Sequence, residues 1–290
     1  MPLPADLPVV DHHCHLSPTG EGVAAARRFR RAGGTHLFLA TQSYEPVAPT
    51  TLEGYRAQFE TTEKMGRAIR DDSGVVVYPV VAPYPWDLVP AVERLGREAA
   101  VRLHFEALDL AGQFVRDGRA VALGEVGRPH MPVPEPIADA ASAVLVHALE
   151  VARDVGCPAV VHSEDLDAAG YRRLAEVAGQ VGLPTHRLVK HYARSRIARG
   201  DAAGVVPSYL ARRELVRQVV DDPASWFLET DFLDDRRRPG AVLDLETVPR
   251  RAAQIAAGGA ASLERLRIPF EESVRAVYGF TIAVPEERAG

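Results

Sequence analysis

Histidines and carboxylates stand at the ends of short apolar runs at five places in this chain of 290 residues. The first place is an Asp-His-His-Cys-His motif that follows two valines near the N-terminus. Because side chains alternate along a strand, Asp11, His13 and His15 should share one face. His12 and Cys14 should then point to the other face. Two imidazoles two residues apart can bind one metal ion, although such a pair can also be structural.

Two carboxylates occupy comparable positions. Glu125 follows the apolar run 120–123, where a carboxylate is costly unless it is paired or binds a cation. Its two interpretations are a salt bridge with Arg128 and a metal ligand shared by two ions. Asp231 ends a Phe-Leu-Glu-Thr-Asp motif and should share a face with Glu229. Asp231 lies nearer the end of the run and is the better active-site candidate.

Two more histidines, His162 and His191, also end apolar runs. Either one alone would more often be a hydrogen-bonded core residue, but both stand at matching positions. The predicted metal ligands are therefore His13, His15, Glu125, His162, His191 and Asp231. Mixed nitrogen and oxygen ligands are typical of zinc, manganese, iron or cobalt. Six ligands exceed what one catalytic zinc takes, so we expect two ions.

Eight apolar runs alternate with amphipathic segments, and this alternation predicts the elements that position the ligands. The runs cover 9–10, 36–40, 75–82, 120–123, 159–161, 188–189, 205–207 and 226–228. Helices are expected over 22–32, 52–70, 91–117, 137–155, 168–181, 194–202, 212–220, 248–257 and 271–278. Eight strand–helix units predict an α/β fold, a (β/α)8 TIM barrel, with an open doubly wound sheet as the alternative. Catalytic groups of such a barrel lie at the carboxyl ends of its strands.

Composition and charge exclude several classes of protein. A hydrophobic fraction of 47% excludes a disordered chain, and two cysteines exclude a disulfide scaffold. A formal charge of −5 argues against a general basic face for duplex DNA. No apolar run is long enough to cross a bilayer, and no signal peptide is evident. We expect one domain over residues 1–290, located in the cytoplasm, with no sequence signal that fixes an oligomeric state.

The motifs resemble, in order, those of the amidohydrolase superfamily and, within it, the TatD-like metal-dependent hydrolases. The resemblance rests on 11–15, on Gly-Glu-Val-Gly at 124–127 and on Glu-Thr-Asp at 229–231, and it spans about 9–280. It implies two divalent ions (Zn, Mn or Mg), with His13 and His15 on one ion and Glu125 as the bridge. His162 and His191 would complete the shell. Asp231 would touch a metal and take a proton, so Asp231 and Glu125 are the candidate catalytic residues.

Several positions depart from the common bacterial nuclease form. Ser163 and Glu164 follow the histidine at 162, and Tyr192 and Ala193 follow the one at 191. The loop 128–132 and the stretch 231–240 differ as well. These features resemble an archaeal-type or otherwise divergent subgroup.

The resemblance implies a hydrolase that uses a metal-activated water, a TatD-like phosphodiesterase or deoxyribonuclease. The alternative is a hydrolase of cyclic amides or lactones from the same superfamily, because the two share the metal site. A non-catalytic barrel would be marked by loss of ligands, and all six are present. We expect a small molecule or a single-stranded DNA end as substrate, with no duplex-wide nucleic-acid face and no membrane partner.

The candidate substrate-binding residues lie in loops on the catalytic side. His130 is the strongest of them, since three prolines stiffen its loop. Arg128 lies in the same loop, and Arg194 follows the run 188–189. Arg196 and the arginine run 236–238 are further positive groups on this side.

Overall fold

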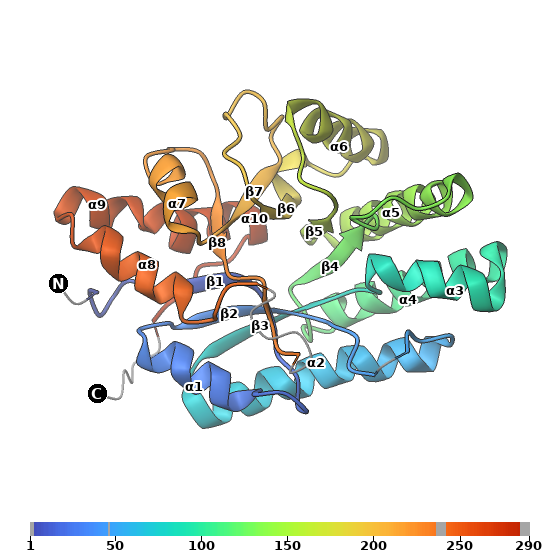
Figure 1. Ribbon diagram of the computed structural model, residues 1–290, viewed down its shortest axis with the longest axis horizontal. Coiled ribbons are helices and arrows are strands. Elements are labelled where there is room, and N and C mark those ends of the chain that lie inside the picture. The colour runs from blue at the N-terminus through green and yellow to red at the C-terminus, as the bar shows by residue number, and fades with distance from the viewer. Residues whose placement is uncertain (1–2, 46, 236–241, 285–290) are drawn as a thin grey trace.

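A parallel sheet that curls round until its last strand meets its first forms the centre of the molecule, with helices outside it (Figure 1). The computed structural model describes residues 3–45, 47–235 and 242–284. Within them nine strands run in the order β8-β7-β6-β5-β4-β3-β2-β1-β9, and every pairing is parallel. The two-residue β9 follows β8 closely and pairs with β1, so β8 and β9 together act as the eighth strand. The predicted (β/α)8 TIM-barrel fold is confirmed.

The strands are β1 (Val10–His15), β2 (His36–Ala40), β3 (Val76–Val81), β4 (Ala122–Gly127), β5 (Ala159–His162), β6 (Leu188–Ala193), β7 (Val206–Leu210), β8 (Phe227–Glu229) and β9 (Phe232–Leu233). The α-helices are α1 (Val23–Arg31), α2 (Leu52–Ser73), α3 (Leu88–Leu95), α4 (Arg97–Arg116), α5 (Glu135–Val155), α6 (Ala168–Val181), α7 (Arg213–Val219), α8 (Thr247–Ala256), α9 (Ala260–Arg265) and α10 (Ser273–Tyr278). Single turns of other helix types cover Pro85–Asp87, Thr185–Arg187 and Ile268–Glu272. None of these helices is long and apolar enough to cross a membrane.

Two of the predicted helices are wrong, and one observed helix has no counterpart among the predictions. The segment 91–117 is not one helix, because Gly96 at φ 82° separates α3 from α4. The segment 194–202 is not helical, since the carboxylate of Asp165 accepts hydrogen bonds from the Arg194 N–H and the Ser195 hydroxyl and holds the chain as a loop. The helix α9 was not expected from its sequence.

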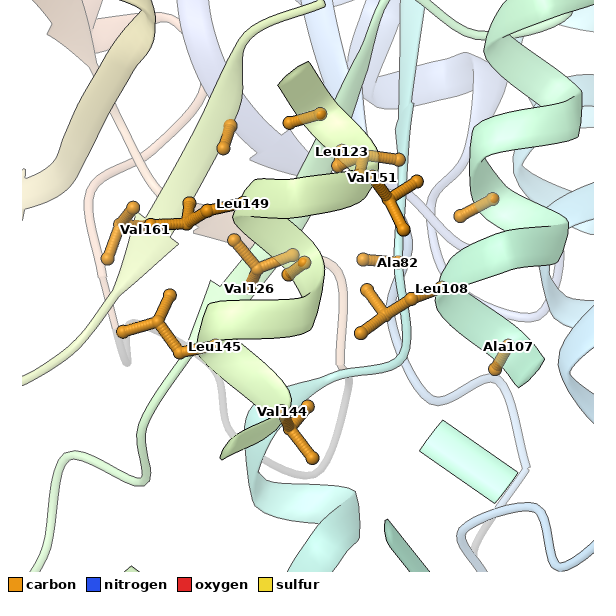
Figure 2. Close-up of a cluster of buried hydrophobic side chains, with 14 of the residues drawn as sticks. Ala82, Ala107, Leu108, Leu123, Val126, Val144, Leu145, Leu149, Val151 and Val161 are labelled. Atoms are coloured by element: carbon orange, nitrogen blue, oxygen red, sulfur yellow. The ribbon is translucent and has the colours of Figure 1, made fainter. Parts of the chain in front are cut away.

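The largest core lies between the sheet and the helices that cover it. Figure 2 shows Leu145 and Leu149 of α5 packing over Leu123 of β4 and Val161 of β5, with Leu108 of α4 beside them. All five side chains are buried. This packing holds β4 and β5 from outside, and their carboxyl ends, which carry the functional motifs, lie at one end of the barrel.

The amino-terminal end of the barrel is closed by aromatic rings. Tyr278 of α10 lies 4.7 Å from Phe38 between ring centroids, and Phe280 lies 5.0 Å from Tyr78. The Tyr278 hydroxyl forms a 2.7 Å hydrogen bond with Nε2 of His12. Among the described residues these rings fill the amino-terminal end, so a site is expected at the carboxyl end.

Candidate metal centre

Three strands change register at the positions of predicted ligands. The shifts lie between Asp11 and Cys14 in β1, between Gly124 and Val126 in β4, and between Lys190 and Ala193 in β6. They enclose His13, Glu125 and His191. A bulge adds a residue to one strand and re-aims its side chains, which is common beside active sites.

The bulge in β1 overturns the simple alternation expected there. Asp11 does not join the two histidines, because its carboxylate accepts from the Thr230 hydroxyl at 2.6 Å and from the Thr230 N–H at 3.0 Å. His12 stacks on Phe227 inside the aromatic end of the barrel. Cys14 lies in the cluster under α1, as alternation predicts.

The two glycines of the Gly-Glu-Val-Gly motif let β4 approach β5. A Cβ at Gly127 would lie 2.0 Å from the carbonyl oxygen of His162. At Gly124 it would lie 2.8 Å from Cβ of Val160. Because no larger residue fits at either position without a shift, the motif brings Glu125 close to His162.

One oxygen of Glu125 faces the histidines of β1. Oε1 lies 2.9 Å from Nε2 of His13 and 3.0 Å from Nε2 of His15, and these nitrogens are 3.2 Å apart. Oδ1 of Asp231 lies 3.6 Å from the His15 nitrogen and 3.8 Å from that of His13. Asp231 sits at φ 50° between β8 and β9, and its N–H donates to the His13 carbonyl at 2.9 Å.

The other oxygen of Glu125 faces the histidines of β5 and β6. Oε2 lies 2.6 Å from Nδ1 of His162 and 3.5 Å from Nε2 of His191. These two nitrogens are 3.0 Å apart. The structure thus brings all six predicted ligands into one cluster, with Glu125 between two groups of donors.

The donor atoms of this cluster fit divalent cations. Oε2 of Glu125 lies 2.6 Å from Nδ1 of His162 but has no hydrogen-bond partner among the described residues. Lone pairs of neighbouring imidazoles repel unless a proton or a cation lies between them. The nitrogen and carboxylate atoms of each group lie within 4.8 Å of one another. Buried imidazole and carboxylate donors at this spacing are what a metal site requires.

Burial and the neighbouring imidazoles shift the pKa values of Glu125 and Asp231 in opposite directions. Burial raises the pKa of Glu125, but the rings of His191 and His162 and hydrogen bonds from β1 hold it well below its usual value. Burial likewise raises the pKa of Asp231, and the hydrogen bond with His15 and the nearby imidazoles leave it below its usual value. Both groups are therefore anionic near neutral pH, the form in which a carboxylate binds a metal.

Two residues that support this cluster were missed by sequence reasoning. Glu229 is fully buried, with Oε1 3.5 Å from Nδ1 of His191 and 2.6 Å from the Tyr192 N–H that donates to it. Burial raises the pKa of Glu229 to about 7. Asp11 anchors Thr230, which precedes Asp231 in the chain. Glu229 could have been found from the face that it shares with Asp231. Nothing in the sequence indicated that Thr230 would donate hydrogen bonds to Asp11.

Of the three candidate substrate-binding residues, one contacts the metal-ligand cluster and two form ion pairs with carboxylates outside it. His130 is close to the cluster, with Nδ1 2.9 Å from Nε2 of His162. Arg128 does not pair with Glu125, and its guanidinium lies 2.6 Å from Glu164 in an exposed ion pair. Arg194 borders the pocket, with Nε 3.8 Å from Asp165.

The two further arginine positions give no support to a basic rim. Arg196 lies 3.9 Å from Asp222. It is not part of the pocket lining described below. The run 236–238 lies outside the described residues.

An open pocket of about 1060 Å³ leads to the cluster. Its lining includes His15, Glu125, His162, His191 and Asp231, so the cluster forms part of its wall. Beyond the cluster the described lining carries the carboxylates Glu45, Asp87, Glu164, Asp165, Asp234 and Asp235. Arg194 is the one arginine among the described lining residues. The pocket is large enough for a drug-sized molecule, and the described part of its rim is acidic.

Comparison with known proteins gives family matches over almost the whole chain. The TatD related DNase family matches residues 10–279. An uncharacterized protein of Methanocaldococcus jannaschii is 30% identical over 275 residues, which cover 94% of this chain and 96% of that protein.

Solved structures resemble the fold. A TatD-like protein from Archaeoglobus fulgidus has a TM-score of 0.63 at 15% identity, covering 93% of this chain and 100% of that one. A TatD homologue from Escherichia coli has a TM-score of 0.61 at 17% identity, covering 93% and 98%. A mutant of a lactonase from Deinococcus radiodurans has a TM-score of 0.61 at 13% identity, covering 95% and 96%. The family members and their structural neighbours are metal-dependent hydrolases, and the clustered donors of this chain fit divalent metals.

Proposed function

This chain belongs to the TatD related DNase family, and from its site we propose a phosphodiesterase that uses two divalent ions and acts on short substrates. The observation that carries the proposal is the division of Glu125 between two histidine pairs. Two ions held on either side of one carboxylate suit the in-line displacement of a phosphodiester, where both entering and leaving oxygens need stabilisation.

The ligand roles follow from the distances. His13, His15 and Asp231 would hold one ion, and His162 and His191 the other, with Glu125 shared by both. Imidazole with carboxylate favours zinc or manganese over magnesium. Glu229 would keep the proton of His191 on Nδ1, which leaves Nε2 free to bind the metal.

The ions, when bound, would supply Lewis acidity and a water of lowered pKa. Asp231 is the group placed to move a proton, because its side chain is 16% exposed and borders the pocket. It would accept the proton of the attacking water and return it to the leaving oxygen. Its left-handed backbone and its hydrogen bond to the His13 carbonyl hold it in position. His130, beside His162, would contact the substrate at the pocket mouth.

Charge around the pocket favours short substrates over long strands. A protein that tracks a nucleic-acid backbone needs a positively charged groove, often with aromatic rings on which bases stack. The described lining has carboxylates and one arginine instead. A small phosphodiester or a single nucleotide end carries far fewer phosphates than a long strand, so the carboxylates of the rim repel it less.

The test of the proton-transfer role is Asp231→Asn. This change keeps the shape of the side chain and removes its basicity, so we expect turnover to fall by at least ~100-fold. The readout is steady-state hydrolysis of bis(p-nitrophenyl) phosphate with added zinc or manganese, together with metal content. Turnover near that of the unchanged protein would remove Asp231 from this role.

The bond that is broken is tested by a substrate panel. It contains a small phosphodiester, single-stranded DNA labelled at its end, a lactone and a cyclic amide. We expect the phosphodiester to be hydrolysed fastest. The likeness to lactonase structures makes carbonyl hydrolysis the second candidate, and activity on the lactone or amide alone would replace the first.

A further inference from the structure

The segment that follows β3 forms an aromatic wall beside the candidate metal ligands. The ring of Tyr84 meets that of His162 edge-on, with centroids 5.3 Å apart at 78°. The ring of Trp86 lies 6.0 Å from that of His130. Tyr84 and Trp86 are both half-buried and both border the pocket. The wall therefore lines part of the pocket in front of the candidate metal ligands.

The wall continues into a buried carboxylate, Asp87, which also borders the pocket. The residue is 4% exposed, and its Oδ1 accepts from the Ser43 hydroxyl at 3.3 Å. Its Oδ2 has no hydrogen-bond partner among the described residues. Burial raises the pKa of Asp87 to about 7, and the Ser43 hydrogen bond offsets this only in part. A buried acceptor without a donor costs free energy that a donor on a ligand would recover.

A purely structural role does not account for this carboxylate. Asp87 precedes α3, where the helix dipole favours a negative charge. Its side chain nevertheless makes no capping hydrogen bond to α3. The helix therefore supplies no donor to Oδ2, and this atom belongs to a residue that lines the pocket.

We propose that Asp87 recognises a protonated amino group on the substrate, while Trp86 and Tyr84 pack against the carbon chain that carries it. An ammonium offers three donors and the charge that matches a carboxylate, and it is attracted by aromatic faces. The acidic rim described above does not repel such a group. This inference rests on the proposed hydrolysis at the metal centre and narrows its substrate to small phosphodiesters that bear a primary amine.

The first experiment compares matched esters with the metal-loaded enzyme. Aminoethyl and propyl p-nitrophenyl phosphate differ in little more than an ammonium in place of a methyl group, and aminobutyl and pentyl esters repeat the comparison with a longer spacer. We expect kcat/KM to favour an ammonium ester by about 10–100-fold, mainly through KM. Asp87→Asn should abolish that preference and leave the alkyl esters within about twofold. Glu93→Gln, an exposed carboxylate of α3 outside the pocket, should keep the preference.

Equal losses on both esters in Asp87→Asn would mean a structural role and would overturn the proposal. An unchanged enzyme that prefers neither ester at either spacer length would overturn it as well. The size of the preference, not the absolute rate, is the measured quantity.

A second experiment separates this inference from the hydrolytic proposal. Binding of benzylammonium and of benzyl alcohol is followed by tryptophan fluorescence, since Trp86 borders the pocket and the other tryptophan, Trp226, is 1% exposed. We expect Asp87→Asn to weaken benzylammonium binding by about tenfold and to leave benzyl alcohol unchanged. If no phosphodiester is hydrolysed but this dependence holds, the proposed function fails and the recognition stands. If benzylammonium binding does not depend on Asp87, the recognition is overturned whatever bond the enzyme breaks.

Discussion

The two ends of the barrel both contain buried histidines, and they use them in opposite ways. At the amino-terminal end His12 bonds to a tyrosine hydroxyl and stacks on Phe227, and His36 bonds to the Thr35 hydroxyl. At the carboxyl end the nitrogens of His13 and His15 converge on one carboxylate oxygen, with no hydroxyl between them.

The difference shows how to distinguish a packed histidine from a candidate ligand. Burial lowers the pKa of His36 to about 4 and that of His12 well below its usual value, so both rings are neutral. Each ring bonds to one hydroxyl, and Nδ1 of His12 has no hydrogen-bond partner among the described residues. The cluster around Glu125 has more donors and acceptors than its own hydrogen bonds can satisfy. The donor atoms at one end of the barrel fit divalent cations, whereas aromatic rings surround His12 at the other.

The largest effect is expected from Glu125→Gln at the carboxyl end. A glutamine amide presents one oxygen and one NH2 group, so it cannot bridge two ions, and the imidazoles lose the anion between them. We expect the loss of at least one ion per chain and a fall in kcat/KM of at least ~100-fold. Metal analysis and steady-state kinetics measure both. Full metal content in the variant would contradict the bridging role and weaken the contrast between the two ends.

A smaller effect at the same end is expected from Glu229→Gln. The amide oxygen still accepts the Tyr192 N–H but is a weaker partner for Nδ1 of His191. Metal affinity should fall by about 10–100-fold, measured by competition with a fluorescent chelator. Because the volume is kept, the thermal unfolding midpoint of the chelated protein should barely change. Unaltered affinity would show that Glu229 is only a core residue.

At the amino-terminal end, the contribution of His36 to stability should depend on pH and not on metal binding. Its pKa is about 4 in the folded chain and 6.5 when unperturbed, so the unfolded chain binds the proton first as pH falls. The stability it contributes is complete above 6.5 and is lost as pH falls towards 4, by about 2 kcal/mol at pH 5.

His36→Gln should make the loss of stability between pH 7 and pH 5 shallower. Denaturant unfolding at several pH values measures it, with His147→Gln on the outer face of α5 as the control. An identical pH profile in the His36 variant would show that this ring is not the one that charges on unfolding.

The smallest effect is expected from Tyr278→Phe. The change removes the hydrogen bond with His12 and keeps the ring that packs on Phe38. Unfolding free energy should fall by about 1 kcal/mol, with kcat/KM and metal content unchanged. A loss of metal in this variant would show that the two ends are coupled and would break the comparison.

The sequence alone determined the fold class and the set of residues to watch. Short apolar runs, several of them next to a glycine or proline and alternating with amphipathic segments, sufficed to predict eight strand–helix units and a barrel. Since all such strands run the same way, their carboxyl ends must meet, and this placed His13, Glu125, His162 and Asp231 at one end before any contact was known.

Hydrophobic periodicity does not reveal where a helix is interrupted or replaced by a loop. Gly96 ends one helix and begins the next inside a segment whose apolar spacing continues across it. The loop at 194–202 has helical spacing, but the carboxylate of Asp165, in the loop after β5, accepts from the Arg194 N–H and the Ser195 hydroxyl. Long-range hydrogen bonds of this kind leave no periodic trace in the chain.

Tertiary structure alone decided which atoms face one another. Alternation placed Asp11 with His13 and His15, whereas the bulge in β1 turned Asp11 toward Thr230. The division of Glu125 between two histidine pairs and the unpartnered oxygen of Asp87 depend on strands and loops far apart in sequence. The sequence determines which side chains reach the open end of the barrel. The alternation of strands and helices makes all strands parallel, so the last residues of each strand meet at the same end. Register and bulges are set by packing between neighbouring strands, and these decide what the side chains meet there.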